Sequence, residues 1–314
     1  MAYRGKIPRA IEREYITELR KVLKQTRKIL EERVLNLLPG IITEYELQLR
    51  SDSPIDDLEL SFNNARAGVA EYLSEVSKRV ADKVAARTSD WNTKLITNEI
   101  SRELQGTAVK KETKRLFTTL TKARLEGDYT KKKGPILRRL KKLKSPEVQK
   151  VLIQKHSAFQ YKTEPWLRES LKAFSENNVT LIKSNNIQFL DQSQELIYRS
   201  MQAGERHEAI ASKLFSRQKD NLGRMSVYRK AETRAAVIAR DQVSKLNGNL
   251  TRMRQENTGV RYYIWRTAGD GRVRPAHRSL ANKRYSWKKG AGGLHPGEDV
   301  MCRCYAEPIL ELPS

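Results

Sequence analysis

The sequence contains very little cysteine and no long apolar stretch. Its two cysteines, Cys302 and Cys304, are separated by one residue, so they cannot build a disulfide framework. No apolar run approaches the roughly 20 residues that a membrane-spanning helix needs. Residues 1–10 also lack the apolar core of a secretory signal. These absences argue against a membrane protein and a disulfide-stapled secreted domain, and they favour a protein of the reducing cytoplasm.

Apolar content is low as well, whereas charge is plentiful. Hydrophobic residues make up 38% of the 314-residue chain and charged residues 31%, a balance that indicates exposed or extended helices. A chain of this length has room for about two or three domains. The formal net charge of +24 favours a polyanionic partner or surface.

Much of this charge lies in one short segment. Between Lys110 and Lys144 there are 14 lysines and arginines against 3 acidic residues, a net charge of +11. No aromatic side chain is interleaved with the densest charges, so the segment predicts sequence-independent contact with the phosphates of double-stranded DNA. A solvated face or a flexible linker is the alternative. The predicted DNA-binding residues are Lys131, Lys132, Lys133, Arg138, Arg139, Lys141, Lys142 and Lys144.

The first half of the chain is predicted to be helical. One helix is expected between Pro8 and Pro39-Gly40, and another is expected to begin at Ser53-Pro54. Each carries one apolar stripe at helical spacing, which favours two helices that pack on each other over an oligomerising coiled coil. The first stripe comprises Tyr15, Leu19, Val22, Thr26 and Ile29. The second comprises Leu58, Phe62, Ala65, Val69, Tyr72, Val76 and Val80.

Further helices are predicted in the second half. They are expected over residues 166–174, 190–202, 209–215 and 226–255. A turn is expected at Asn177-Asn178, followed by a short strand over residues 179–182. The buried stripe of the last helix is expected to comprise Ala239, Val243, Leu246, Leu250 and Met253.

The chain is predicted to end in a small sheet. Strands are expected over residues 260–265, 283–288 and 302–305, and a short helix over 275–280 has Pro275 in its first turn. The predicted fold class is α+β and predominantly α-helical. Elongated N-terminal helices lead through a basic connector to a C-terminal helical module with this sheet at its end. The predicted domains are 1–127 for the N-terminal helices, 128–165 for the connector and 166–314 for the module, whose helices occupy 166–256 and whose small α/β end occupies 257–314.

Three motifs in the second half resemble a known family. They are ARDQVSKLNGNL from Ala239, WRTAGDGRVRPAHRSL from Trp265 and HPGEDVMCRC from His295. Together they resemble the phage head morphogenesis or minor capsid proteins, often called phage Mu protein F-like, over the C-terminal third to half of the chain. The resemblance implies a virion protein present in few copies near the portal vertex of the head and assembled in the host cytoplasm.

The same resemblance implies roles in procapsid assembly and in DNA packaging or delivery. The implied partners are the portal protein, the major capsid or scaffold protein and double-stranded DNA, with no membrane. The family motifs assign a structural or binding role to Arg240, Asp241, Trp265, Arg266, Thr267, Asp270, Arg272, Arg274, His277, His295, Pro296, Cys302 and Cys304.

Four of these residues are candidate zinc ligands. His277, His295, Cys302 and Cys304 offer two nitrogen and two sulfur donors. Structural zinc sites usually place two residues between paired cysteines, whereas two thiols in C-x-C on an extended strand are not expected to converge on one tetrahedral centre. The sequence therefore predicts no cofactor, with zinc as the alternative.

A catalytic interpretation would use Asp270, Arg272, Arg274 and His277, together with Glu298 or Asp299. Neither a nucleophile nor a Gly-rich phosphate loop nor a paired-carboxylate signature accompanies them in the sequence. Turn hydrogen bonds and ion pairs explain the same residues, so the protein is predicted not to be an enzyme. A metal-dependent nuclease and a DNA-binding structural protein outside the phage context remain the alternatives.

Overall fold

The computed structural model describes residues 7–47, 53–105 and 164–309. The eight predicted DNA-binding residues between Lys131 and Lys144 lie outside these ranges. None of the helices within them is long and apolar enough to cross a membrane.

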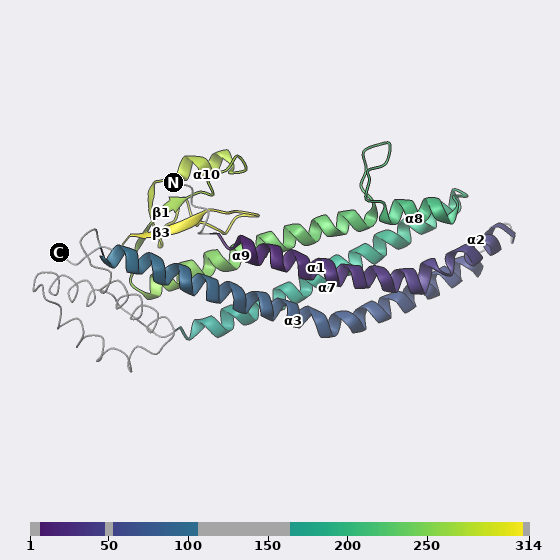
Figure 1. Ribbon diagram of the computed structural model, residues 1–314, viewed down its shortest axis with the longest axis horizontal. Coiled ribbons are helices and arrows are strands. Elements are labelled where there is room, and N and C mark those ends of the chain that lie inside the picture. The colour runs from purple at the N-terminus through teal and green to yellow at the C-terminus, as the bar shows by residue number, and fades with distance from the viewer. Residues whose placement is uncertain (1–6, 48–52, 106–163, 310–314) are drawn as a thin grey trace, which may run out of the picture. The chain divides into compact units, whose positions relative to one another are not determined.

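The fold is α+β and mostly helical, as predicted (Figure 1). The helices are α1 (Arg9–Leu30), the π-helix η1 (Glu31–Leu35), α2 (Leu38–Leu47), α3 (Ser53–Gln105), α7 (Trp166–Gln202), α8 (His207–Phe215), α9 (Val227–Asn257) and α10 (Pro275–Leu280). The strands are β1 (Tyr262–Arg266), β2 (Arg284–Ser286) and β3 (Tyr305–Ile309).

The chain divides into two compact units, each built from segments that are far apart in the sequence. The sheet unit comprises Met1–Ile11, Val84–Lys172 and Asp241–Ser314. The helical unit comprises Glu12–Lys83 and Ala173–Arg240. Several long helices therefore contribute one part to each unit.

In the helical unit, polar side chains connect neighbouring helices across the buried faces. The Tyr15 hydroxyl of α1 donates to Asn178 of α7 at 2.8 Å, and the Thr26 hydroxyl donates to Asn186 at 2.8 Å. The contact that lies later on α1, at Thr26, also lies later on α7, at Asn186. The two helices therefore run parallel. The predicted stripe of α1 is buried throughout, which confirms that interpretation.

Helix α7 is continuous, so the predicted turn at Asn177-Asn178 and the predicted strand over residues 179–182 are wrong. Asn178 is fully buried, and its side-chain amide donates to the Phe174 carbonyl one turn earlier at 2.8 Å. Ser193 makes the equivalent bond to the Phe189 carbonyl at 2.7 Å. Residues that favour turns in isolation are thus held in a helix by bonds within it and by partners on other helices.

The predicted helix end at Pro39-Gly40 is also wrong, because α2 begins at Leu38. Pro39 occupies the first turn of α2, where its missing N–H would have had no intrahelical acceptor. The predicted start of α3 at Ser53 is confirmed, and its apolar stripe is buried except that Leu73 replaces Tyr72 on the buried face.

The sheet is antiparallel, with strand order β2-β1-β3. Tyr263 of the central strand pairs with Tyr285 on one side and with Pro308 on the other. Pro308 fits there because β3 is an edge strand, where a residue without an N–H is tolerated. The expected strands at 260–265 and 283–288 and the expected helix at 275–280 are confirmed within a few residues. The expected strand over residues 302–305 is wrong, since β3 begins at Tyr305.

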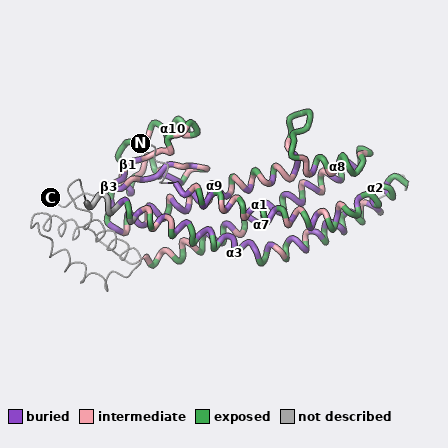
Figure 2. Tube along the Cα trace, in the orientation of Figure 1, coloured by how far each residue is buried: buried purple, intermediate pink, exposed green. Residues whose placement is uncertain are grey.

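The core of the sheet unit packs around this sheet, and parts of the trace near β1 and β3 are coloured as buried (Figure 2). Its buried members are Tyr263, Trp265, Trp287, Cys302, Cys304 and Ala306. Helix α9 is fastened to this core by Gln255, whose amide donates to the Ala306 carbonyl at 2.9 Å and accepts from the Trp287 indole N–H at 3.1 Å. The predicted stripe of α9 is buried from Ala239 to Leu250, but Arg254 is buried in place of the half-exposed Met253.

Glycine is required where α9 meets the turn that follows His295. A β-carbon on Gly248 would lie 2.8 Å from the Pro296 carbonyl oxygen and 3.1 Å from the α-carbon of Gly297. Gly297 has a φ of 94°, a conformation that side chains with a β-carbon rarely adopt. Backbone contact between two glycines therefore sets the distance between α9 and this turn.

Candidate functional site

Three of the four predicted zinc-ligand candidates converge in the sheet unit. His277 is on α10, whereas Cys302 and Cys304 are in the irregular segment before β3, and all three are buried. The imidazole Nδ1 lies 3.5 Å from the Cys302 sulfur and 3.6 Å from the Cys304 sulfur. The three donor atoms lie within 4.8 Å of one another. We call these residues the His-Cys-Cys cluster.

The fourth candidate, His295, belongs to a different contact. Its Nδ1 lies 3.0 Å from the Tyr263 hydroxyl, and its ring centroid lies 5.1 Å from that of Trp287. Burial lowers the pKa of His295 and raises the pKa of Tyr263. The two groups therefore form a neutral hydrogen-bonded pair inside the core.

The expectation that the two C-x-C thiols cannot converge is wrong, because the segment is not extended. Met301 has a φ of 56°, which bends the chain immediately before Cys302. Its backbone N–H donates to the carboxylate of Asp241 on α9 at 2.8 Å, and that contact holds the bend in place. The Cys304 N–H then lies 3.4 Å from the Cys302 sulfur, so both side chains face His277.

The two thiols have different acidities. A hydrogen bond from the Cys304 thiol lowers the pKa of Cys302 to about 6, while the same contact raises the pKa of Cys304. This contact favours the thiolate form of Cys302, and the thiolate is the form of cysteine that binds metals and reacts as a nucleophile.

The charged residues of the family motifs form two groups of contacts. Asp270 pairs with Arg272 at 2.9 Å and with Arg9 at 3.8 Å. Arg274 pairs with Asp299 and donates to the Val300 carbonyl at 2.6 Å. The residues considered for catalysis thus pair with one another and hold turns, as the structural interpretation predicts.

The remaining motif residues support the sheet and the turns around it. Arg266 on β1 pairs with Glu307 on β3 at 2.5 Å and contacts Asn282. Glu298 accepts the His295 N–H at 2.8 Å and so closes the turn that contains Pro296. Thr267 follows β1 directly, and Arg240 is half-buried on α9 in the helical unit.

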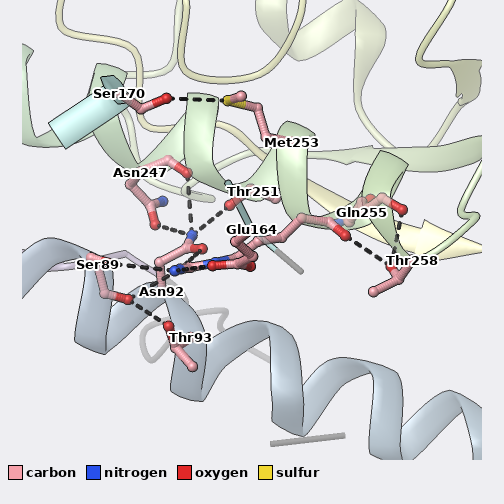
Figure 3. A network of polar contacts seen from close by, with 11 residues as sticks. Ser89, Asn92, Thr93, Glu164, Ser170, Asn247, Thr251, Met253, Gln255 and Thr258 are labelled. Atoms are coloured by element: carbon pink, nitrogen blue, oxygen red, sulfur yellow. Dashed lines mark hydrogen bonds and ion pairs between the residues drawn. The ribbon is translucent and has the colours of Figure 1, made fainter. Parts of the chain in front are cut away.

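A buried polar network in the sheet unit was missed in the sequence (Figure 3). Arg254 is 1% exposed and makes two bonds to the Glu164 carboxylate, at 2.9 and 3.2 Å. It also donates to Asn92 at 2.8 Å and to the Ser89 carbonyl at 3.1 Å. The signal that could have found this network is a polar stripe at helical spacing along α9 and the residue that follows it, comprising Asn247, Thr251, Arg254 and Thr258.

The helical unit has a basic pocket on its surface, with a volume of about 930 Å³. Six cationic side chains line it against two acidic ones, Glu31 and Glu232. The cations are Arg20, Lys21, Lys24, Arg27, Lys28 and Arg217. Arg27 lies over the Phe215 ring at 4.1 Å and pairs with Glu31 at 2.7 Å.

These features describe a mostly helical chain whose sequence motifs surround a small terminal sheet. Residues 191–307 match the family model of the phage Mu protein F like proteins. The match confirms, over this part of the chain, the resemblance to phage head morphogenesis proteins. The match covers the second part of α7, all of α8 and α9, and the terminal sheet as far as Glu307 in β3, with the His-Cys-Cys cluster inside it.

A protein of Haemophilus influenzae described as uncharacterized is 33% identical over 151 residues. The aligned residues are 48% of this chain and 32% of that protein, so the chain matches about a third of its relative's length. No solved structure matches the chain.

Proposed function

We propose a function from the match to the Mu F like proteins over residues 191–307, which indicates a protein related to the phage head and a location in the virion. We propose that this chain is a minor head protein that acts in procapsid assembly and in DNA packaging or delivery. It is present in few copies near the portal vertex, where it contacts the portal protein and the major capsid or scaffold protein. The observation that carries this proposal is the family match over residues 191–307.

The charge distribution supports double-stranded DNA as a further partner. The whole chain has a net charge of +24, and the basic pocket has six cations against two acids. The ion pairs at the pocket involve Lys21, Arg27 and Lys28. Within the described residues, no carboxylate lies within ion-pair distance of Arg20, Lys24 or Arg217, so these three cations are not neutralised by a neighbouring acid. Cations on an exposed surface attract DNA phosphates of any sequence.

The ion pairs of the motif residues support a role without catalysis. Asp270, Arg274 and Asp299 each hold a neighbouring turn or side chain, and the family is one of structural phage proteins. We therefore propose that the protein positions other components of the head and does not act on DNA as a nuclease.

The composition of purified heads tests the proposed function. We expect quantitative mass spectrometry of heads from the genetic element that encodes this chain to find it in a few copies per head, alongside the portal protein. DNA-free procapsids should contain it as well, because the proposal places it in assembly. Heads that lack the protein, or that contain it in the copy number of the major capsid protein, would refute the proposal.

DNA affinity should depend steeply on salt and little on sequence. Fluorescence anisotropy with two duplexes of unrelated sequence is expected to give equal affinities that fall linearly on a log–log salt plot, because bound phosphates release counterions. Neutralising the eight predicted residues between Lys131 and Lys144 should reduce the slope by about 1 for each phosphate that the protein no longer neutralises.

The basic pocket provides a second arm of the same experiment. Arg20→Gln with Lys24→Gln should also weaken binding to both duplexes. Lys288→Gln with Lys289→Gln removes the same charge from exposed positions of the sheet unit and serves as the matched control. If the pocket variant keeps the wild-type slope, the pocket is not in the DNA interface.

A further inference from the structure

The His-Cys-Cys cluster has the chemistry of a metal site that the Mu F like match does not assign. Its donor atoms are one imidazole nitrogen and two thiol sulfurs, drawn from α10 and from the segment before β3. Thiolate and imidazole together select zinc and other soft transition metals over magnesium and calcium. His277, Cys302 and Cys304 are between 4% and 8% exposed, so a bound ion would be screened from bulk water.

The spacing of the donor atoms fits a tetrahedral ion. At a zinc centre with bonds of about 2.3 Å to sulfur and about 2.0–2.1 Å to nitrogen, nitrogen and sulfur ligands lie roughly 3.5–3.6 Å apart. The Nδ1 of His277 lies 3.5 Å from one sulfur and 3.6 Å from the other. Both separations therefore match those of ligands on one ion.

The two sulfurs face the same nitrogen of His277 at nearly equal distances. A neutral imidazole has one nitrogen with a free lone pair, and that nitrogen accepts one proton. With its proton on Nε2, His277 can therefore accept from only one of the two thiols at a time. A single cation that accepts three lone pairs satisfies the nitrogen and both sulfurs at once.

The orientation of His277 supplies an independent observation. Its other ring nitrogen, Nε2, lies 3.2 Å from the Asp299 carboxylate. A carboxylate on one side of an imidazole holds the proton on that nitrogen and turns the unprotonated nitrogen toward the opposite side. Metal-binding histidines are commonly oriented by this arrangement. Asp299 is itself held by Arg274 and by the Val300 N–H, the latter at 2.8 Å.

We propose that His277, Cys302 and Cys304 bind one zinc ion, with water as the fourth ligand and Asp299 as the residue that positions the imidazole. Binding converts both thiols to thiolates and releases their protons, so zinc affinity rises with pH. The ion fastens α10 to the segment that leads into β3. The inference does not depend on the proposed role in the phage head.

Metal analysis of the full-length chain tests the proposal. Protein expressed in zinc-supplemented medium and then desalted is expected to contain one equivalent of zinc. Cobalt(II) substitution should produce thiolate-to-cobalt charge-transfer bands and the visible bands of a tetrahedral ion. The single variants Cys302→Ser and Cys304→Ser should each lose the zinc. Neither variant should show the charge-transfer bands that a cobalt ion with two thiolate ligands produces. His295→Gln changes a buried histidine outside the cluster and should keep one equivalent.

The substitution Asp299→Asn tests whether Asp299 positions the His277 imidazole for zinc or only supports the fold. We expect this variant to keep the stoichiometry but to bind zinc about 10–100-fold more weakly in a chelator competition. The cobalt spectrum of the wild-type protein reports the ligands of the metal directly, so the proposal can be tested even if a serine variant fails to fold. Wild-type protein without stoichiometric zinc, one equivalent of iron in its place, or undiminished zinc in both serine variants would each overturn the proposal.

Discussion

Replacement of Arg254 by methionine is expected to destabilise the sheet unit by about 3–5 kcal/mol, the usual cost of breaking a buried ion pair by removing one partner. Arg254 is 1% exposed, and the Glu164 side chain is 5% exposed. Without the guanidinium, the Glu164 carboxylate would be left buried without its counter-charge. Asn92 and the Ser89 carbonyl would also be deprived of their bonds from Arg254.

The matched control for this substitution lies two residues earlier on the same helix. Arg252 is 37% exposed and pairs with Glu256 at 3.4 Å and with Glu298 at 3.6 Å. Exposed ion pairs of this kind contribute about 0–1 kcal/mol, so Arg252→Met should cost far less than Arg254→Met. Adding Glu164→Gln to Arg254→Met should recover part of the stability, because it removes the unpaired charge.

Urea unfolding followed by tryptophan fluorescence measures the stability of the sheet unit in each variant. All four tryptophans of the chain, Trp91, Trp166, Trp265 and Trp287, belong to the sheet unit. Their emission therefore reports the unfolding of that unit within the full-length protein. Equal unfolding midpoints for Arg254→Met and Arg252→Met would show that the buried network does not stabilise the fold.

The second large effect is expected at Trp265. Trp265→Ala should destabilise the same unit by about 3–5 kcal/mol, since truncation of a buried aromatic side chain forfeits transfer free energy and leaves a cavity. The indole is 0% exposed and packs edge-on against His277 and Tyr285, with ring centroids 5.7 and 6.0 Å away. The substitution therefore also removes one wall of the His-Cys-Cys cluster.

Tyr262 on the same strand provides the control for Trp265. Its side chain is half-buried on the opposite face of β1, with the Arg284 guanidinium 4.0 Å from its ring centroid. Tyr262→Ala should cost clearly less than Trp265→Ala, because it removes a cation–π interaction and a half-buried ring but leaves no cavity in the core. The three tryptophans that remain in Trp265→Ala still report unfolding. A wild-type midpoint for that variant would mean that the indole does not support the core.

The sequence alone predicted the elements whose signals are local. Pro275 marks the first turn of α10, and β-branched and aromatic residues before Gly269 mark β1. The apolar stripe of α1 is buried as its spacing predicts. In these segments the preferences of neighbouring residues agree with the final fold, so the α+β class and the family motifs could be recognised without coordinates.

Only the tertiary structure decided the course of α7 and the partners of the charged residues. Asn178 favours a turn by itself, but the Tyr15 hydroxyl lies 163 residues away and stabilises it inside a helix. Arg254 looks like an ordinary helical cation until Glu164, 90 residues earlier, is placed against it. Contacts over such separations leave no trace in local propensity, because each partner alone would be solvated.

The convergence of the two cysteines was decided in the same way. An extended C-x-C segment would not direct both sulfurs to His277, and the sequence between them contains no turn residue. The bend comes from Met301, whose left-handed backbone is held by the Asp241 carboxylate 60 residues earlier on α9. Residue types could therefore nominate His277, Cys302 and Cys304 as metal ligands, but a contact from a distant helix determined that their donor atoms meet, because it stabilises a backbone conformation that a methionine seldom adopts.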